Sequence, residues 1–292
     1  MYDQAENLRN IVRQQNQHNI GNAKVITITS GKGGVGKSNT AVNLAVCFRK
    51  MGKRVIVFDA DFGLANVEVM FGTMPKYTLK DLIYEGKSIT DIITKGPMDI
   101  GFISGGSGIV GLNNLTHDQI DFLVRSLSKL NELTDVLIID TGAGVSDSVL
   151  EFVVASPEVI LITTPEPSSL TDSYSLMKAL YKHPGFKGDD TNIRLLANKV
   201  RNEEEGRSIY EKLSSVVTEF LHGHISYLGM VPQDRILENA VRSQKVVSEY
   251  APTAASSYAY NDVAKKLMGE DSKVEYRWGI TQIFSHFVRG NS

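Results

Sequence analysis

One feature limits how this chain can fold more than any other, a glycine-rich loop with the sequence Gly31-Lys32-Gly33-Gly34-Val35-Gly36-Lys37-Ser38. It fits the phosphate-binding pattern G-x-x-x-x-G-K-[ST], which needs a strand before the loop and a helix after it. Residues 25–29 are all β-branched and predict a buried strand, while apolar residues recur at helical spacing over residues 41–48. The order of strand, loop and helix therefore predicts a P-loop.

The chemistry of this loop suits a nucleoside triphosphate. Its glycines allow main-chain N–H groups to surround the phosphates, and the following helix directs its positive end at the same anion. We expect Lys37 to reach the β- and γ-phosphates and Ser38 to bind Mg²⁺, with Asn39 also lining the site. A chance glycine turn before an ordinary helix is the alternative, and the flanking elements argue against it.

Short apolar runs alternate with helical stretches along the rest of the chain. They cover residues 55–58, 100–103, 136–139, 159–162, 193–197 and 225–230. This rhythm predicts an α/β fold, a single P-loop NTPase domain with a mostly parallel, doubly wound sheet and helices on both faces. In such a sheet the ligand lies beyond the carboxyl ends of the strands, so polar residues after each run are candidates for the site.

Length and composition favour one large domain. The 292 residues are 42% hydrophobic, and no Pro/Gly/Ser-rich linker divides them. We expect an ATPase domain over residues 23–268, an N-terminal helix and tether over 1–22, and a C-terminal amphipathic segment over 269–292. Cys47 is the single cysteine, so an intramolecular disulfide is impossible. With neither a signal peptide nor an apolar run of spanning length, we expect a cytoplasmic protein.

Carboxylates follow two of the predicted strands. Asp61 is the candidate for orienting an attacking water, and Asp59 either assists or only fixes the loop. Two strand-end capping aspartates are the alternative reading. Asp140 follows an apolar run, the placement of a carboxylate that holds Mg²⁺ directly or through water. The loop after it is expected to sense the γ-phosphate, and its residues are Thr141, Gly142, Ala143 and Gly144.

Two further strand exits suggest contacts with the base. Asn198-Lys199 matches the start of the guanine-reading N-K-x-D sequence, but Arg201 stands where its aspartate belongs. A guanidinium cannot accept hydrogen bonds from guanine, so adenine and hence ATP are favoured. Pro232, Gln233 and Asp234 are the candidates at the last strand. A strand-end turn is the alternative role for Asn198.

These motifs together resemble the deviant Walker A family of ATPases, which includes MinD, ParA-type partition proteins and the nitrogenase iron protein. The resemblance covers about residues 23–268, and the lysine pair Lys32 and Lys37 is its most specific part. It implies Mg²⁺-dependent ATP hydrolysis by a homodimer with ATP sandwiched between the subunits, in which Lys32 contacts the partner's nucleotide. Electron transfer is excluded, because a single cysteine cannot supply two cluster ligands per subunit.

The C-terminal segment has an amphipathic pattern. Over residues 276–290, large apolar side chains fall along one helical face and polar or cationic ones opposite. We expect this face to lie reversibly in the cytoplasmic side of the membrane, through Trp278, Ile280, Ile283, Phe284, Phe287 and Val288. Packing of this helix on its own domain is the alternative.

The N-terminal residues indicate which members of this family the chain most resembles. Asp3-Gln4-Ala5 with Leu8-Arg9 is similar to the activator motif of FlhG proteins, MinD-like regulators of flagellar number and placement. The resemblance implies two partners, the signal-recognition-particle-type GTPase FlhF and components of the flagellar C-ring. A frayed amphipathic N-terminus is the alternative for so short a motif.

Two other functions within the family stay open. A division-site MinD protein would share the core and the membrane helix but not the activator, and a ParA protein would bind DNA. The net charge of −2 and a pI near 6.3 give no general attraction to nucleic acid, so we expect no specific nucleic-acid partner.

Overall fold

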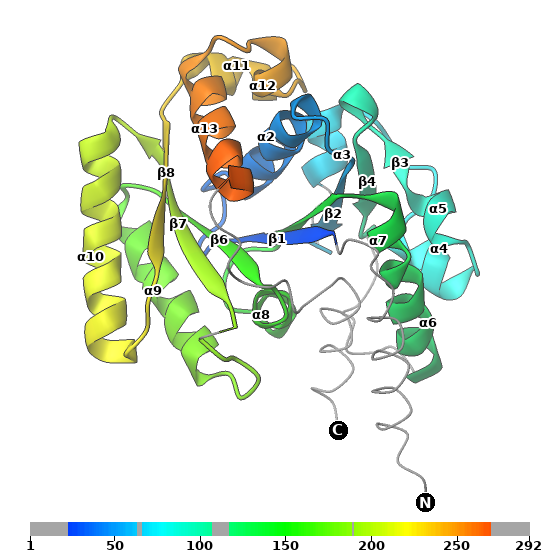
Figure 1. The fold of residues 1–292 in the computed structure, drawn as a ribbon, viewed down its shortest axis with the longest axis horizontal. Coiled ribbons are helices and arrows are strands. Elements are labelled where there is room, and N and C mark those ends of the chain that lie inside the picture. The colour runs from blue at the N-terminus through cyan, green and yellow to red at the C-terminus, as the bar shows by residue number, and fades with distance from the viewer. Residues whose placement is uncertain (1–22, 63–65, 107–116, 189, 270–292) are drawn as a thin grey trace, which may run out of the picture.

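The computed structural model describes residues 23–62, 66–106, 117–188 and 190–269. Its centre is an eight-stranded sheet with the order β3-β4-β2-β5-β1-β6-β7-β8 (Figure 1). The strands are β1 (Lys24–Thr29), β2 (Val55–Ala60), β3 (Thr94–Lys95), β4 (Gly101–Ser104), β5 (Val136–Thr141), β6 (Glu158–Thr163), β7 (Asn192–Val200) and β8 (Ser226–Pro232). All neighbours pair in parallel except β3, which is antiparallel to β4.

The helices cover both faces of this sheet. They are α2 (Lys37–Lys50), α3 (Asn66–Phe71), α4 (Leu79–Tyr84), α5 (Ile89–Ile92), α6 (His117–Ser128), α7 (Leu130–Leu133), α8 (Asp147–Val154), α9 (Pro167–Lys182), α10 (Glu203–Leu221), α11 (Arg235–Arg242), α12 (Val247–Tyr250) and α13 (Ala255–Gly269). Alternation along β1 divides the core, because Ile26 and Ile28 pack on the α2 and α13 side while Val25 packs on the other. The predicted doubly wound α/β fold is confirmed.

The sequence placed the long strands correctly, with ends that differ by a few residues. It missed β3, because two residues are too few to show a hydrophobic period. The proposed activator residues 3–9 and membrane residues 278–288 lie outside the described residues, as do the whole N-terminal segment and all of the C-terminal segment except Gly269, which ends α13. Among the described helices, none is both long and apolar enough to cross a bilayer.

The position of β1 defines where a ligand can bind. It lies between β5 and β6, and the chain leaves it for β2 on one side of the sheet before β6 continues on the other. The carboxyl end of β1 is therefore a topological switch point, where open α/β sheets form their ligand crevice. The glycine-rich loop begins at this point.

Candidate nucleotide site

The glycine-rich loop joins β1 to α2 in the geometry that its sequence requires. Gly34 and Gly36 have φ angles of 75° and 104°, which residues other than glycine rarely adopt. Gly36 caps α2, and Lys37 and Ser38 form its first turn. Since α2 starts here, its unpaired N–H groups face the space enclosed by the loop.

Gly31 also meets a steric requirement. A Cβ atom at this position would collide with the backbone of Asp172 and Ser173 in α9, whereas one at Gly33 would meet only Ala143 Cβ, at 3.9 Å. The first glycine of the loop thus fixes its distance from α9.

This difference gives a testable prediction. Gly31→Ala should lower the melting temperature, because forcing a methyl group against backbone typically costs about 1–3 kcal/mol. That corresponds to roughly 2–12 °C in a domain of this size. Gly33→Ala is the matched control and should melt within about a degree of the parent protein in a calorimetric scan. Equal melting temperatures for the two variants would contradict this packing.

Asp140 is the most unusual polar residue of the site. It is fully buried near the end of β5, and neither carboxylate oxygen has a hydrogen-bond partner in the described part of the chain. Burial, and after it the charge of Asp59, raises the pKa of Asp140 to about 8, against the opposing effects of the nearby Ser38 hydroxyl and of the charge of Lys37. A buried carboxylate without partners is costly unless a ligand supplies them.

This arrangement fits Mg²⁺. Magnesium is usually held by one or two protein oxygens together with substrate phosphates and water, so a cage of protein ligands is not required. No group of three or more potential ligands occurs among the described residues. Ser38 at the start of α2 and the orphaned Asp140 oxygens are the groups that would hold the ion directly or through water.

The two predicted loop carboxylates have different surroundings. Asp59 is buried in β2, in register with Asp140 on β5. Its oxygens accept hydrogen bonds from the backbone N–H groups of Asp61 (3.1 Å), Asn66 (3.0 Å) and Val67 (3.1 Å). Burial nevertheless raises the pKa of Asp59 to about 7. Of the two roles that the sequence left open, these contacts favour fixing the loop.

Asp61 has neighbours in both the P-loop and the predicted switch loop. It is partly exposed, and its Oδ2 accepts a hydrogen bond from Asn66 Nδ2 at 3.4 Å. Its charge acts on Lys37, whose pKa burial lowers while Asp140 and Asp61 raise it. Asp61 also adjoins Gly142, where an added Cβ would lie 3.7 Å from Asp61 Oδ1. The carboxylate therefore stands between the P-loop lysine and the predicted switch loop.

The predicted switch loop contacts the P-loop segment directly. Thr141 Oγ1 donates to the carbonyl of Ile28 at 3.0 Å, and Gly144 N–H donates to the carbonyl of Ser30 at 3.0 Å. Gly144 has a φ of 90°. A change in the conformation of this loop would therefore act directly on the backbone that leads into the P-loop.

The predicted base-contacting residues are largely engaged with protein. Asn198 Nδ2 donates to the carbonyl of Val35 at 2.7 Å, and Lys199 Nζ donates to that of Gly34 at 2.8 Å, so both hold the P-loop. Asp234 caps α11 through Ile236 N–H and accepts two hydrogen bonds from Ser256. Pro232 ends β8, and Gln233 N–H donates to the carbonyl of Val200 at 2.9 Å. Contact of these residues with adenine stays a prediction.

Lys32 has partners that the sequence did not reveal. Its ammonium donates to Glu166 Oε2 at 2.7 Å and to Ser168 Oγ at 2.8 Å, both at the start of α9. The hydrogen bond from Lys32 lowers the pKa of the Glu166 carboxyl. Glu166 follows β6, so the rule that singled out polar residues at strand exits could have found it.

A P-loop at a switch point, a buried carboxylate opposite it and a second loop lysine define a P-loop NTPase of the MinD and ParA type. The chain belongs to the CobQ/CobB/MinD/ParA nucleotide-binding domain family, whose model matches residues 26–247.

Within this family, the chain is similar to two named relatives over most of its length. The chain is 40% identical to antiactivator FleN of Pseudomonas aeruginosa over 84% of its length and 86% of the relative's. It is 34% identical to flagellum site-determining protein YlxH of Helicobacter pylori over 92% of both chains. Among solved structures, MinD of Pyrococcus horikoshii complexed with Mg-ADP has a TM-score of 0.66 at 22% identity and covers 86% of this chain and 99% of its own. The last comparison supports the fold.

Proposed function

We propose that this protein is an ATP-dependent dimerising ATPase of the FlhG type, which regulates the number and placement of flagella. The observation that carries the ATPase part is the combination of a complete P-loop with the buried Asp140, whose carboxylate oxygens have no hydrogen-bond partner among the described residues. The names and high coverage of the FleN and YlxH relatives support the flagellar part.

In the proposed cycle, Lys37 neutralises the phosphates while Ser38 and Asp140 hold Mg²⁺, which neutralises charge on the transferred phosphoryl group. Asp61 orients the attacking water. Lys32 leaves Glu166 and Ser168 and reaches the nucleotide of a second copy, so that ATP occupancy favours the dimer. Because the ion pair of Lys32 with Glu166 is exposed, little free energy opposes this exchange.

The terminal segments connect this cycle to the cell. The dimer carries two copies of the C-terminal segment, and two weak anchors on one particle bind far more tightly than one. We propose that ATP therefore recruits the protein to the cytoplasmic face of the membrane. There the N-terminal residues 3–9 stimulate an FlhF-like GTPase, and the protein contacts C-ring components.

Vesicle flotation tests the membrane and partner parts together. With ATP the full chain should float with vesicles, and Phe284→Glu/Phe287→Glu should abolish flotation while leaving ATP binding intact. Asp61→Ala, expected to slow hydrolysis, should prolong vesicle binding after ATP is withdrawn. When an FlhF-like GTPase is added to the vesicles, the bound protein should raise the rate at which this GTPase hydrolyses GTP. Flotation of the double phenylalanine variant would assign that segment to internal packing.

A division-site MinD function is the second candidate, because the family to which the chain belongs includes MinD. The GTPase measurement separates the two. Absence of binding and of GTPase stimulation would favour the MinD function, whereas stimulation that is lost on deleting residues 1–12 would support the FlhG function.

A further inference from the structure

A basic turn joins α2 to β2 at the amino-terminal ends of the strands, and the nucleotide site lies at their opposite, carboxyl ends. Residues 49–54 read Arg-Lys-Met-Gly-Lys-Arg, with four cations and no acid. Because α2 has 14 residues, a helix of that length places this turn about 20 Å from the P-loop. The cations of the turn therefore cannot serve the bound triphosphate.

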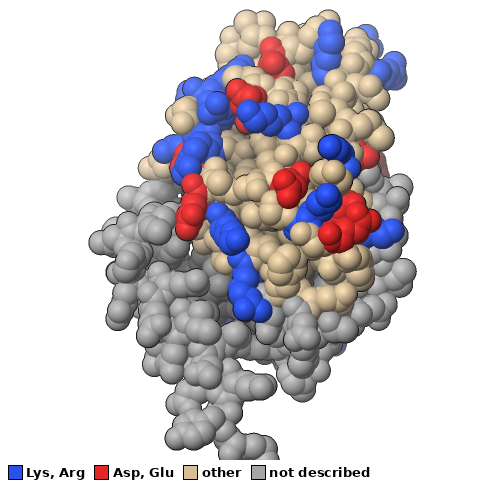
Figure 2. Space-filling model, turned by 90° about the vertical axis from the view of Figure 1, so that its right-hand side faces the viewer, with Lys and Arg blue, Asp and Glu red and all other residues tan. Residues whose placement is uncertain are grey.

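Among the described residues, one of the four cations in this turn has a carboxylate within ion-pair distance. Arg54 is paired with Asp135 at 2.8 Å, but Arg49 and Lys50 donate to the uncharged carbonyl oxygens of Met98 and Ser248. The Lys53 ammonium makes no hydrogen bond or ion pair with any described residue. Figure 2 shows basic side chains gathered at the upper left of the face that it presents, with a few acidic ones among them.

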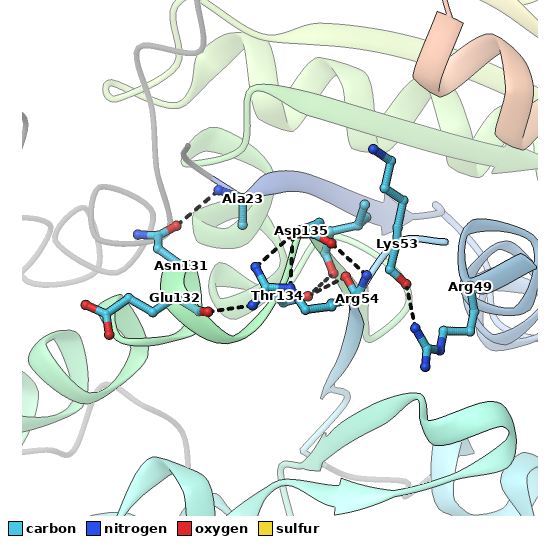
Figure 3. Close-up of polar contacts among 9 residues, drawn as sticks. Ala23, Arg49, Lys53, Arg54, Asn131, Glu132, Thr134 and Asp135 are labelled. Atoms are coloured by element: carbon cyan, nitrogen blue, oxygen red, sulfur yellow. Dashed lines mark hydrogen bonds and ion pairs between the residues drawn. The ribbon is translucent and has the colours of Figure 1, made fainter. Parts of the chain in front are cut away.

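The Arg54 contacts hold the turn in place. Its guanidinium binds Asp135 Oδ1 and the carbonyl of Glu132, and its backbone N–H binds Asp135 Oδ2 at 2.8 Å. Figure 3 shows these contacts at the start of β2 and β5, with the Lys53 side chain extending away from them. Arg54 thus anchors the turn, while, within the described part of the chain, the charges of Arg49 and Lys50 meet only carbonyl oxygens.

The last described helix ends at the same edge. Lys24, the first residue of β1, donates from its ammonium to the carbonyl of Leu267 in the last turn of α13. Lys24 and Val55 both pair in register with Val136, so the starts of β1 and β2 lie two strand spacings apart, about 10 Å. The last described residue, Gly269, therefore lies on the same side of the sheet as the basic turn.

α13 adds another cation next to this exit. Lys265 is exposed in its last turns, and its ammonium has no hydrogen bond or ion pair within the described ranges. Because the end of α13 lies beside the start of β1, we group Lys265 with the cations of the turn and call Arg49, Lys50, Lys53 and Lys265 the basic edge.

We propose that this basic edge is a second membrane contact, which binds the headgroups of anionic phospholipids when the C-terminal segment inserts. The inference rests on the proposed membrane association and gives it a lipid preference. One weak apolar anchor gives only marginal binding, and a basic patch beside it supplies the second signal that stable attachment needs. The overall charge of −2 is compatible, because the attraction acts only within about a Debye length of the surface.

The test uses the full chain with ATP and two kinds of vesicle, pure phosphatidylcholine and a mixture with phosphatidylglycerol. Lys53→Gln/Lys265→Gln should bind the anionic vesicles at least about 10-fold more weakly, since each cation near such a surface contributes roughly 5-fold. Binding to phosphatidylcholine and ATP hydrolysis should not change. Lys178→Gln/Lys212→Gln removes the same charge from exposed positions on α9 and α10 and should have no effect.

Any of the following results would overturn the proposal, and each points to a different reason. If the parent protein floats equally with both vesicles and the double variant does too, membrane association stands without the basic edge. If the parent protein floats with neither vesicle, the proposed membrane function itself fails. An equal loss in the Lys178→Gln/Lys212→Gln control would reduce the effect to net charge, and selective loss of duplex DNA retention would assign the edge to nucleic acid.

Discussion

Asp140→Asn should abolish ATP hydrolysis and at the same time stabilise the nucleotide-free protein. Even loss of a residue that only orients a metal's ligands typically reduces metal affinity or activity by about 10- to 100-fold, and loss of the Asp140 charge reduces transition-state stabilisation further. Stability should rise because an amide in place of a buried, partnerless carboxylate removes a desolvation cost of about 1–3 kcal/mol. In a domain of this size that is roughly 2–12 °C in melting temperature.

The stabilisation should depend on pH. The pKa of Asp140 is raised by burial from 3.8 to about 8, so the folded protein binds a proton that the unfolded chain releases. The stability of the parent protein therefore falls as pH rises from about 4 to about 8. The Asn variant lacks this term, so its advantage should be small at pH 5 and largest near pH 9. Thermal unfolding without Mg²⁺ or nucleotide measures both values.

Asp59→Asn is the matched control, since Asp59 pairs in register with Asp140 on the next strand. Its oxygens accept three backbone hydrogen bonds, and an amide nitrogen in place of one oxygen would face N–H donors. Asp59→Asn should therefore be destabilised. If Asp59→Asn gains stability and Asp140→Asn loses it, the description of the two carboxylates is wrong.

Lys32→Ala should bind ATP but hydrolyse it at least about 10³-fold more slowly, the effect of removing a cation that acts on a neighbouring subunit's phosphates. A mixture tests whether the lysine acts across the dimer. Lys32→Ala supplies an intact metal site and Asp140→Asn supplies Lys32, so mixed dimers should regain part of the activity that neither variant has alone. Mixing without recovery would indicate that Lys32 acts within its own subunit.

Glu166→Gln provides the complementary variant. It removes the charge that holds Lys32 at α9 but leaves every proposed nucleotide contact in place. Dimerisation should occur at equal or lower ATP concentration than in the parent protein, and the same titration on Ser168→Ala should give a smaller change in that direction.

The sequence predicted the local motifs of the site better than the contacts that their side chains make. Strand, P-loop and helix follow from local patterns, as do Asp140 and Asp59 at strand ends, because hydrophobic period and glycine spacing are local properties. The contact of Lys32 with Glu166 joins residues 134 positions apart, and no local pattern encodes it. Asp234 presents a different difficulty, because its local sequence fits two roles. An aspartate after a strand can contact a ligand, or it can cap the next helix, as Asp234 does for α11.

The central claim is that ATP occupancy and pairing of two copies are one event, mediated by Lys32. Sedimentation velocity of Lys32→Ala, with ATP and with ADP, tests it most directly when the slow-hydrolysing Asp61→Ala variant is run beside it. We expect Asp61→Ala to sediment as a dimer with ATP and Lys32→Ala to stay monomeric with either nucleotide. If Lys32→Ala forms an ATP-dependent dimer at the same protein concentration as Asp61→Ala, Lys32 does not couple ATP binding to dimerisation.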